Sequence, residues 1–154
     1  FWQYRIIRSL LFMGSAMTTH TKIRVGVIGA GRIGKLHAEH LATRIPGTEL
    51  AAIADVNITT AQSTAAQFNV PVAVSDYHAL LDNPAIEAVV ICSTADTHAQ
   101  IIQDAAAAGK HIFCEKPIDF NLGRIDRTLA AVEKAGVKLQ IGFNRRFDPR
   151  VRET

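Results

Sequence analysis

The chain has 154 residues, of which 48% are hydrophobic and 20% charged, and its formal net charge is +3. This composition excludes a disordered chain, and the length suits one domain with its own hydrophobic core. The excess positive charge comes from arginines near the two ends, Arg5 and Arg8 and then Arg145 to Arg152, so the body between them has no basic surface. We therefore expect no nucleic-acid partner.

The first sixteen residues, FWQYRIIRSLLFMGSA, differ from the rest of the chain because they lack an initiating Met and precede Met17, which reads like a natural start. We expect residues 1–16 to be a leader or non-native segment without fixed structure, with a cleaved targeting peptide as the alternative. Their apolar run is too short to span a bilayer, and we expect no membrane partner.

Residues 23–28 form a β-branched run that predicts a strand, and a glycine-rich turn, Gly29-Ala30-Gly31-Arg32-Ile33-Gly34, follows it directly. Apolar residues at helical spacing then predict a helix. In this pattern Gly29 lets the chain turn sharply, Gly31 lets the backbone approach a pyrophosphate, and Gly34 lets the helix lie close to the strand. The N-terminus of the helix would add unpaired N–H groups for the phosphates.

A second predicted strand, Glu49 to Ala54, ends at Asp55, which lies 21 residues beyond Gly34. An acid at this distance is expected to bind the ribose hydroxyls of a dinucleotide. The glycine pattern alone leaves a plain glycine-rich turn as an alternative, whereas the two features together favour a dinucleotide site. A carboxylate repels a 2′-phosphate and no arginine follows in Val56-Asn57, so we expect NAD rather than NADP.

Strands and helices continue to alternate along the chain. The first helix stops at Ile45-Pro46-Gly47. The next predicted elements are a helix capped by Asn57 or Thr59 and ended by Asn69, an edge strand over residues 71–74, a short helix capped by Ser75 and running to Leu81, and a buried strand over residues 88–92.

A polar turn, residues 93–98, follows this buried strand and opens a helix that runs to Ala108. One interpretation of Thr94 or Asp96 in this turn is simply the helix N-cap. However, ligands of open α/β sheets bind at the carboxyl ends of the strands, and this turn lies at such an end. The next strand, residues 111–114, delivers Glu115-Lys116-Pro117 to the same edge.

A helix over residues 122–132, ended by Gly136, and a sixth strand over residues 137–141 complete the pattern. Because strands and helices alternate throughout, the sequence predicts an α/β fold, a doubly wound parallel sheet with strand order 3-2-1-4-5-6.

The two cysteines, Cys92 and Cys114, occur in apolar strand-like runs rather than in Cys-x-x-Cys or Cys/His spacing. We interpret them as reduced core thiols of a cytoplasmic protein, in preference to a disulfide or a metal site. No bound metal is expected.

Several motifs together resemble a known family: RVGVIGAGRIGKLHAEHL, the strand ending at Asp55, STADTH, GKHIFCEKPI and QIGFNRRFDP. They are similar to the glucose-fructose oxidoreductase, inositol dehydrogenase and rhizopine-catabolism (Gfo/Idh/MocA) family, and most of all to its myo-inositol 2-dehydrogenases. The resemblance covers Lys22 to about Pro149. The EKP motif after the fifth strand and GFNRRFDP after the sixth are more specific than the glycine pattern.

The resemblance implies roles for particular residues. Lys116 would be catalytic, binding the reacting hydroxyl and stabilising charge on its oxygen, and Pro117 would follow a cis peptide bond. A solvated surface lysine is the alternative for Lys116. For Arg145 or Arg146 the alternative is pairing with Asp148 or support of the domain junction. The residues implied to bind NAD are Gly29, Ala30, Gly31, Arg32, Ile33, Gly34, Asp55, Ser93, Thr94, His98, Glu115, Lys116 and Arg146.

The resemblance also implies an activity and a domain plan. The parent protein would be an NAD-dependent oxidoreductase that transfers hydride from a secondary hydroxyl of a cyclic polyol or sugar to nicotinamide, and full-length members are expected to be homo-oligomers. Residues 17–143 would be the dinucleotide-binding domain, and residues 144–154 would begin the junction to a C-terminal α/β substrate domain that is missing. We expect such a fragment to be inactive alone. The alternative is a non-catalytic NAD-binding or regulatory module.

Overall fold

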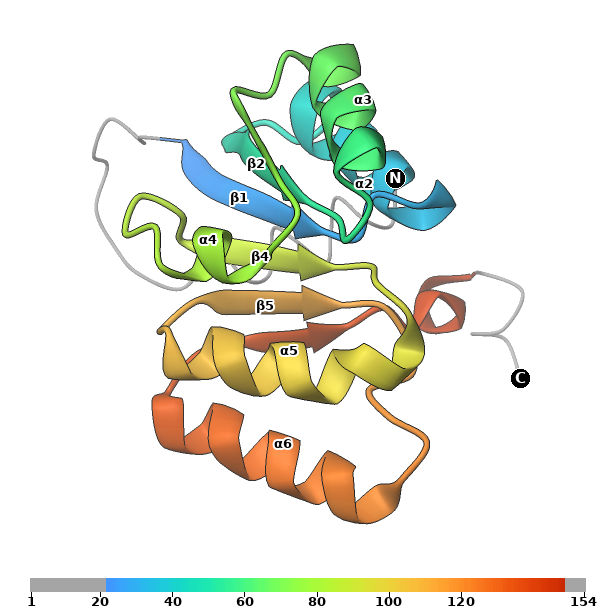
Figure 1. Cartoon of the computed structure of the whole chain (residues 1–154). Helices are drawn as coiled ribbons and strands as arrows, with labels where there is room; N and C mark the ends of the chain where they lie inside the picture. Colours follow the sequence, from blue (N-terminus) through green and yellow to red (C-terminus); the bar gives the residue numbers. More distant parts are fainter. Residues whose placement is uncertain (1–21, 149–154) are drawn as a thin grey trace, which may run out of the picture.

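The computed structural model describes residues 22–148, which form one α/β unit with alternating strands and helices (Figure 1). The predictions for residues 1–16 and for residues 149–154 lie outside this range. In chain order the elements are β1 (Ile23–Ile28), α2 (Arg32–Thr43), β2 (Thr48–Ala54), α3 (Ile58–Phe68), β3 (Val72–Val74), α4 (His78–Leu81), β4 (Ala88–Ile91), α5 (Ala95–Ala107), β5 (His111–Cys114), α6 (Leu122–Ala135), β6 (Leu139–Ile141) and the 3-10 helix η1 (Asn144–Phe147).

The strands form a parallel six-stranded sheet in the order β3-β2-β1-β4-β5-β6, which confirms the predicted topology. At its centre Ile28 of β1 pairs with Ile91 of β4, and Ile91 pairs with Cys114 of β5. Because all strands run the same way, their carboxyl ends share one edge, at the arrowheads in Figure 1. The loops after β1, β2, β4 and β5 therefore meet there.

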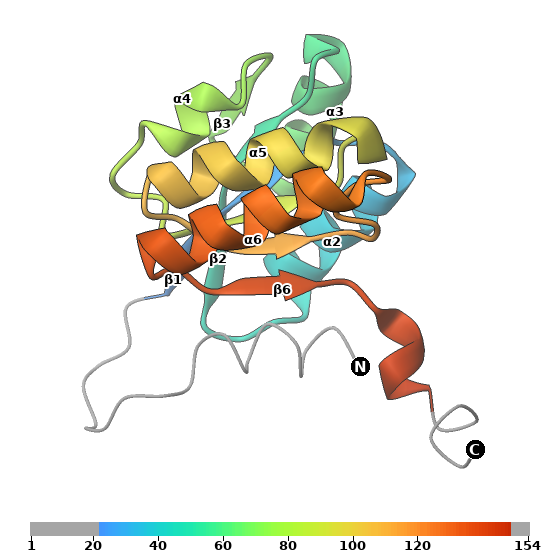
Figure 2. The same cartoon turned by 90° about the horizontal axis from the view of Figure 1, so that it is seen from below.

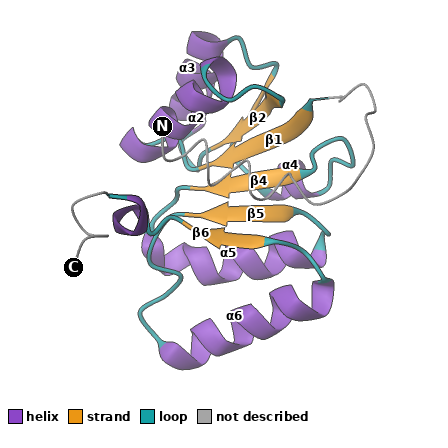
Figure 3. Cartoon of the chain, turned by 180° about the vertical axis from the view of Figure 1, so that it is seen from behind, coloured by secondary structure: helices purple, strands orange, loops and turns teal. Residues whose placement is uncertain are grey.

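Helices cover the two faces of the sheet, and each face has its own hydrophobic core. On one face, Ala38 and Leu41 of α2 and Ala61 and Ala65 of α3 pack against Val27 and other residues of the strands. The opposite face carries α4, α5 and α6, as the turned views in Figures 2 and 3 show. Continuous burial on both sides explains why β4 and β5 read as unbroken apolar runs.

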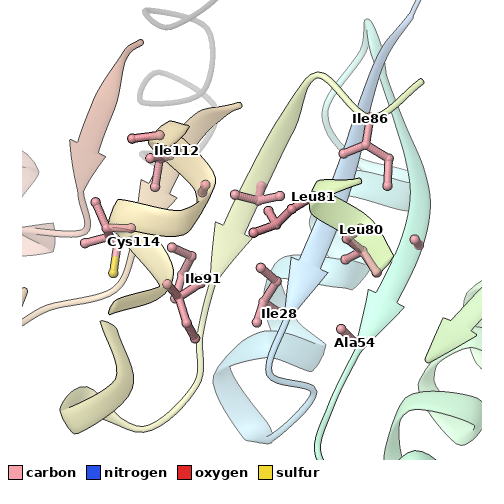
Figure 4. Packing of buried hydrophobic residues seen from close by; sticks show 14 of the residues in the cluster. Ile28, Ala54, Leu80, Leu81, Ile86, Ile91, Ile112 and Cys114 are labelled. Atoms are coloured by element: carbon pink, nitrogen blue, oxygen red, sulfur yellow. The ribbon is translucent and has the colours of Figure 1, made fainter. Parts of the chain in front are cut away.

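The core under α4 and α5 is shown in Figure 4. Leu80 and Leu81 of α4 lie over Ile28 and Ile91, and Ile112 continues the same layer on β5. All of these side chains are at least nine-tenths buried. The short helix α4 is therefore held by packing, because four residues are too few to be stable alone.

One predicted helix cap is wrong. Ser75 does not cap α4, which begins at His78. Instead the Asp76 carboxylate accepts a hydrogen bond from the His78 backbone N–H at 2.9 Å, so a local Asx turn precedes the helix and delays its start. By contrast, Asn57 caps α3 as one of the two predicted alternatives, and Asn69 ends it in the left-handed conformation.

Candidate functional site

A cleft of about 490 Å³ lies at the carboxyl edge of the sheet, between the ends of β1, β2 and β4. Among the predicted cofactor residues, it is lined by Gly29, Gly31, Asp55, Ser93 and Thr94. Residues from three separate loops are thus brought together, as expected for a doubly wound sheet.

The glycine loop has the geometry that its three glycines suggest. Gly29 has φ +91°, and a β-carbon there would lie 2.5 Å from the Ser93 nitrogen. A β-carbon on Gly34 would collide with the Gly29 carbonyl oxygen, so α2 lies directly against the loop. A β-carbon on Gly31 would meet nothing within 4 Å, which leaves open space above the loop.

Asp55 closes the β2 side of the cleft and is tied to the glycine loop. Its Oδ2 accepts a hydrogen bond from the Ala30 N–H at 2.7 Å, and its Oδ1 accepts one from the Asn57 N–H at 2.9 Å. Each carboxylate oxygen keeps a further lone pair for another donor. The side chain is therefore fixed in place and still able to accept hydrogen bonds from ribose hydroxyls.

The turn after β4 is held by its own side chains. The Ser93 and Thr97 hydroxyls are 2.7 Å apart. His98 is buried, and its ring nitrogens lie 2.7 Å from the Pro117 carbonyl oxygen and 3.0 Å from that of Ser93. His98 therefore links the two loops that follow β4 and β5, behind the residues that line the cleft.

The loop after β5 carries the EKP sequence. The Lys116–Pro117 peptide bond is cis, which confirms that prediction. Glu115 Oε1 lies 2.9 Å from Nε2 of His37 on α2. Partial burial of Glu115 works against its ionisation, but the hydrogen bond with His37 and the interactions with His37 and Lys116 outweigh it and lower the pKa of this carboxyl.

Lys116 itself is exposed, and its ammonium has no hydrogen bond or ion pair with another residue in the part of the chain that the structure describes. It stands directly after the strand next to β4, at the edge of the sheet where the cleft lies. This position suits a hydrogen-bond donor to a ligand oxygen.

The remaining predicted cofactor residues do not line the cleft. Ala30 is buried and donates to Asp55, and Gly34 packs α2 against the loop. Arg32 is exposed at the start of α2, and Arg146 is exposed in η1, beyond β6. Outside the lining are Ala30, Arg32, Ile33, Gly34, His98, Glu115, Lys116 and Arg146.

Sequence reasoning missed several residues that do line the cleft, namely Val56, Ser75, Tyr77, Thr97, Gln100 and Ile101. Ser75 and Tyr77 follow β3 at the same edge, so the rule about strand ends was a signal that could have found them. The Tyr77 hydroxyl donates to Asp104 on α5 at 2.7 Å, and burial together with this bond raises the pKa of the phenol.

Both cysteines are free thiols, as predicted. Cys92 lines the floor of the cleft and Cys114 is buried on the opposite face of the sheet. Burial raises the pKa of each thiol, so both are protonated at neutral pH. Within residues 22–148 no group of three or more His, Cys, Asp or Glu side chains is placed to hold a metal, and no helix is long and apolar enough to cross a membrane.

These residues fit a bound dinucleotide. The first N–H groups of α2 have no partner within the helix, and the open space above Gly31 gives phosphate oxygens access to them. The Asp55 carboxylate lies at the end of β2, the strand beside β1, where it would accept hydrogen bonds from the adenosine ribose. A neutral valine and asparagine come after it, so nothing there balances a 2′-phosphate.

Comparison with known proteins agrees with this geometry. A family profile described as an oxidoreductase family with an NAD-binding Rossmann fold matches residues 23–143. The chain is 51% identical over 128 residues to the uncharacterized oxidoreductase YrbE of Bacillus subtilis, and 44% identical over 126 residues to myo-inositol 2-dehydrogenase of Thermotoga maritima. These matches cover 83% and 82% of this chain.

A solved structure is also similar. Scyllo-inositol dehydrogenase from Lactobacillus casei, with bound cofactor NAD(H) and scyllo-inositol, has a TM-score of 0.81 and 34% identity, covering 86% of this chain and 39% of that one. The chain likewise spans 37% of the length of each of the two relatives above. From the profile match and the cleft together, the chain belongs to the Gfo/Idh/MocA family of oxidoreductases, through its NAD-binding Rossmann fold.

Proposed function

We propose that this chain is the NAD-binding part of a dehydrogenase that oxidises a secondary hydroxyl of a cyclic polyol, with inositols as the substrate class. The observation that carries the proposal is Lys116, an exposed lysine that follows β5 at the carboxyl edge of the sheet and has no side-chain partner within residues 22–148. The inositol dehydrogenases among the relatives support the choice of substrate. A cytoplasmic location, which the two free cysteines support, belongs to the same proposal.

In this proposal the residues of the chain bind the cofactor and polarise the substrate hydroxyl. Gly31, the N-terminus of α2 and Asp55 hold the cofactor, and bound NAD supplies the hydride acceptor. The Lys116 ammonium donates a hydrogen bond to the reacting hydroxyl oxygen and stabilises the negative charge that develops there as hydride leaves carbon. Ser93 and Thr94 would line the nicotinamide side, and Arg146 would contact nicotinamide or substrate.

A general base for the hydroxyl proton has no good candidate among the described histidines. His37, His78, His98 and His111 each have a hydrogen-bond partner, and His40 lies on α2 away from the cleft lining. Because the chain spans 37% of the length of its first relatives, we propose that the base and most polyol contacts belong to a substrate domain. Residues 17–143 would then be the cofactor domain, residues 144–154 the start of the junction, and the whole protein a homo-oligomer.

The test of cofactor binding is a fluorescence titration of the chain with NADH and with NADPH. We expect saturable binding of NADH, weaker binding of NADPH, and a loss of about tenfold or more in NADH affinity for Asp55→Asn, because hydrogen bonds to a charged acceptor are lost. The matched control is Asp126→Asn, on an exposed position of α6, which should bind like the unaltered chain. A folded chain that binds neither nucleotide would refute the proposed site.

The test of catalysis needs the longer protein. There, Lys116→Ala should abolish inositol oxidation while changing NADH affinity less than twofold, because Lys116 acts on the substrate oxygen. Suppose instead that the longer protein binds NADH but oxidises no polyol, both unaltered and as Lys116→Ala. That result would favour the non-catalytic NAD-binding module.

A further inference from the structure

Glu115 and Lys116 are adjacent residues of opposite charge, yet they do not form an ion pair. Glu115 is instead paired with His37, at 2.9 Å between Oε1 and Nε2. Within residues 22–148 no acidic side chain lies within ion-pair distance of the Lys116 ammonium. The nearest anion in the sequence is thus turned towards another partner.

The fold explains why His37 can reach Glu115. His37 is 1% exposed and lies on α2, the helix that begins at the glycine loop, and its ring centroid is 5.1 Å from that of Phe113. Residues two apart on a strand share a face, so Glu115 follows Phe113 on the face of the sheet that α2 covers. The carboxylate therefore leaves the strand towards α2.

A second contact confines the carboxylate from the other side. A β-carbon on Gly142, just beyond β6, would lie 3.1 Å from Glu115 Oε2, so the glycine backbone borders that oxygen closely. The Gly142 N–H donates to the Cys114 carbonyl oxygen at 2.8 Å, which fixes this segment beside β5. Glu115 is thus held between α2 and the end of β6, with its side chain 20% exposed.

We propose that His37 is a positioning residue that draws the Glu115 carboxylate towards α2 and so leaves the Lys116 ammonium unpaired for a substrate oxygen. The inference rests on the role proposed for Lys116 above. Without His37 the carboxylate loses its side-chain partner and keeps the Lys116 backbone N–H, so the Lys116 ammonium, whose charge already acts on it, is the nearest replacement. The Lys116 ammonium would then be occupied by Glu115 instead of by substrate.

The test is the rate at which trace acetic anhydride acylates Lys116 in the 154-residue chain, followed by peptide mass spectrometry with exposed Lys134 as internal reference. An ammonium that is paired with a carboxylate holds its proton more tightly. Acetic anhydride reacts only with the deprotonated amine, so pairing slows acylation. We expect His37→Leu to slow acylation of Lys116 about two- to fivefold, the effect of a partly exposed ion pair. His37→Gln, whose amide restores a donor, should recover most of the rate.

Two further comparisons separate this role from a purely structural one. In a Glu115→Gln background, His37→Leu should no longer change the rate, because the effect passes through the carboxylate. His40→Leu on the same helix is the matched control and should leave Lys116 unchanged. Should His37→Leu fail to fold by circular dichroism, Glu115→Asp tests the same contact, because its shorter side chain no longer reaches His37 and acylation should slow.

An unchanged Lys116 rate in folded His37→Leu, or equal slowing in the Glu115→Gln background, overturns the proposal. In place of a folded His37→Leu, an unchanged rate in Glu115→Asp does so. The measurement uses neither nucleotide nor polyol, so it can fail while NADH binding succeeds. Conversely, a chain that binds no NADH but shows the coupling would refute the proposed function alone.

Discussion

At the scale of single residues, Gly34 and Gly31 have opposite roles in one loop. A β-carbon on Gly34 would collide with the Gly29 carbonyl oxygen, whereas one on Gly31 would meet nothing, and Gly31 has an ordinary φ of −65°. We expect Gly34→Ala to lower the free energy of unfolding by about 1–3 kcal/mol, because the helix must shift. Gly31→Ala should change it by less than about 0.5 kcal/mol.

The order of the two variants should reverse for NADH binding, with Gly31→Ala having the larger effect on affinity. Gly31→Ala fills the space through which a pyrophosphate would approach, so it should lose most NADH affinity despite an intact fold. Urea unfolding and an NADH titration on both variants measure the two effects. Equal NADH affinity of Gly31→Ala and the unaltered chain would show that the dinucleotide does not cross this loop.

At the scale of elements, the helix caps give a graded prediction. The Asn57 and Asn121 side chains accept hydrogen bonds from the Thr59 and Arg124 backbone N–H groups, whereas Thr94, the N-cap of α5, makes no such bond. Each Asn→Ala change should therefore cost about 1 kcal/mol of unfolding free energy, and Thr94→Ala should cost clearly less. Urea denaturation of the three variants measures this, and equal losses would contradict the capping geometry.

The elements also show how far sequence reasoning reaches. Strand order and the positions of Asn57 and Asn69 at the ends of α3 were predictable. The hydrophobic period and the turn residues are local signals, and the right-handed crossover rule is general. The start of α4 was not, because Ser75 and Asp76 are both good caps by residue type, whereas the structure has Tyr77 at the N-cap position with no side-chain cap. Strand β6 is also shorter than predicted, spanning Leu139–Ile141.

At the scale of the whole molecule, the predictions that remained out of reach depend on contacts between distant residues. His37 and Glu115 are 78 positions apart, and only the packing of α2 beside β5 joins them. Likewise, the ring of His98, a predicted cofactor residue, contacts the carbonyl oxygens of Ser93 and Pro117, and the second of these contacts depends on the fold. Sequence spacing places a residue at an edge of the sheet, but the fold decides which neighbour its side chain meets.

Among the described carboxylates with lowered pKa values, Glu115 and Asp119 are the two whose side chains are largely shielded from solvent, and both contribute to acid stability. Burial raises the pKa of each carboxyl, but favourable interactions outweigh it. For Glu115 these are chiefly the hydrogen bond and charge interaction with His37, and for Asp119 the hydrogen bonds from the Asn121 N–H and from Arg124. A lowered pKa in the folded state means that the stabilisation is complete above the ordinary values of 4.5 and 3.8 and is lost as the pH falls through the folded values. We therefore expect the urea midpoint to fall steeply below about pH 4.5. The double variant Glu115→Gln and Asp119→Asn should start from a lower midpoint at pH 7 and fall less on acidification. If its midpoint falls as steeply as that of the unaltered chain, other carboxylates control acid unfolding.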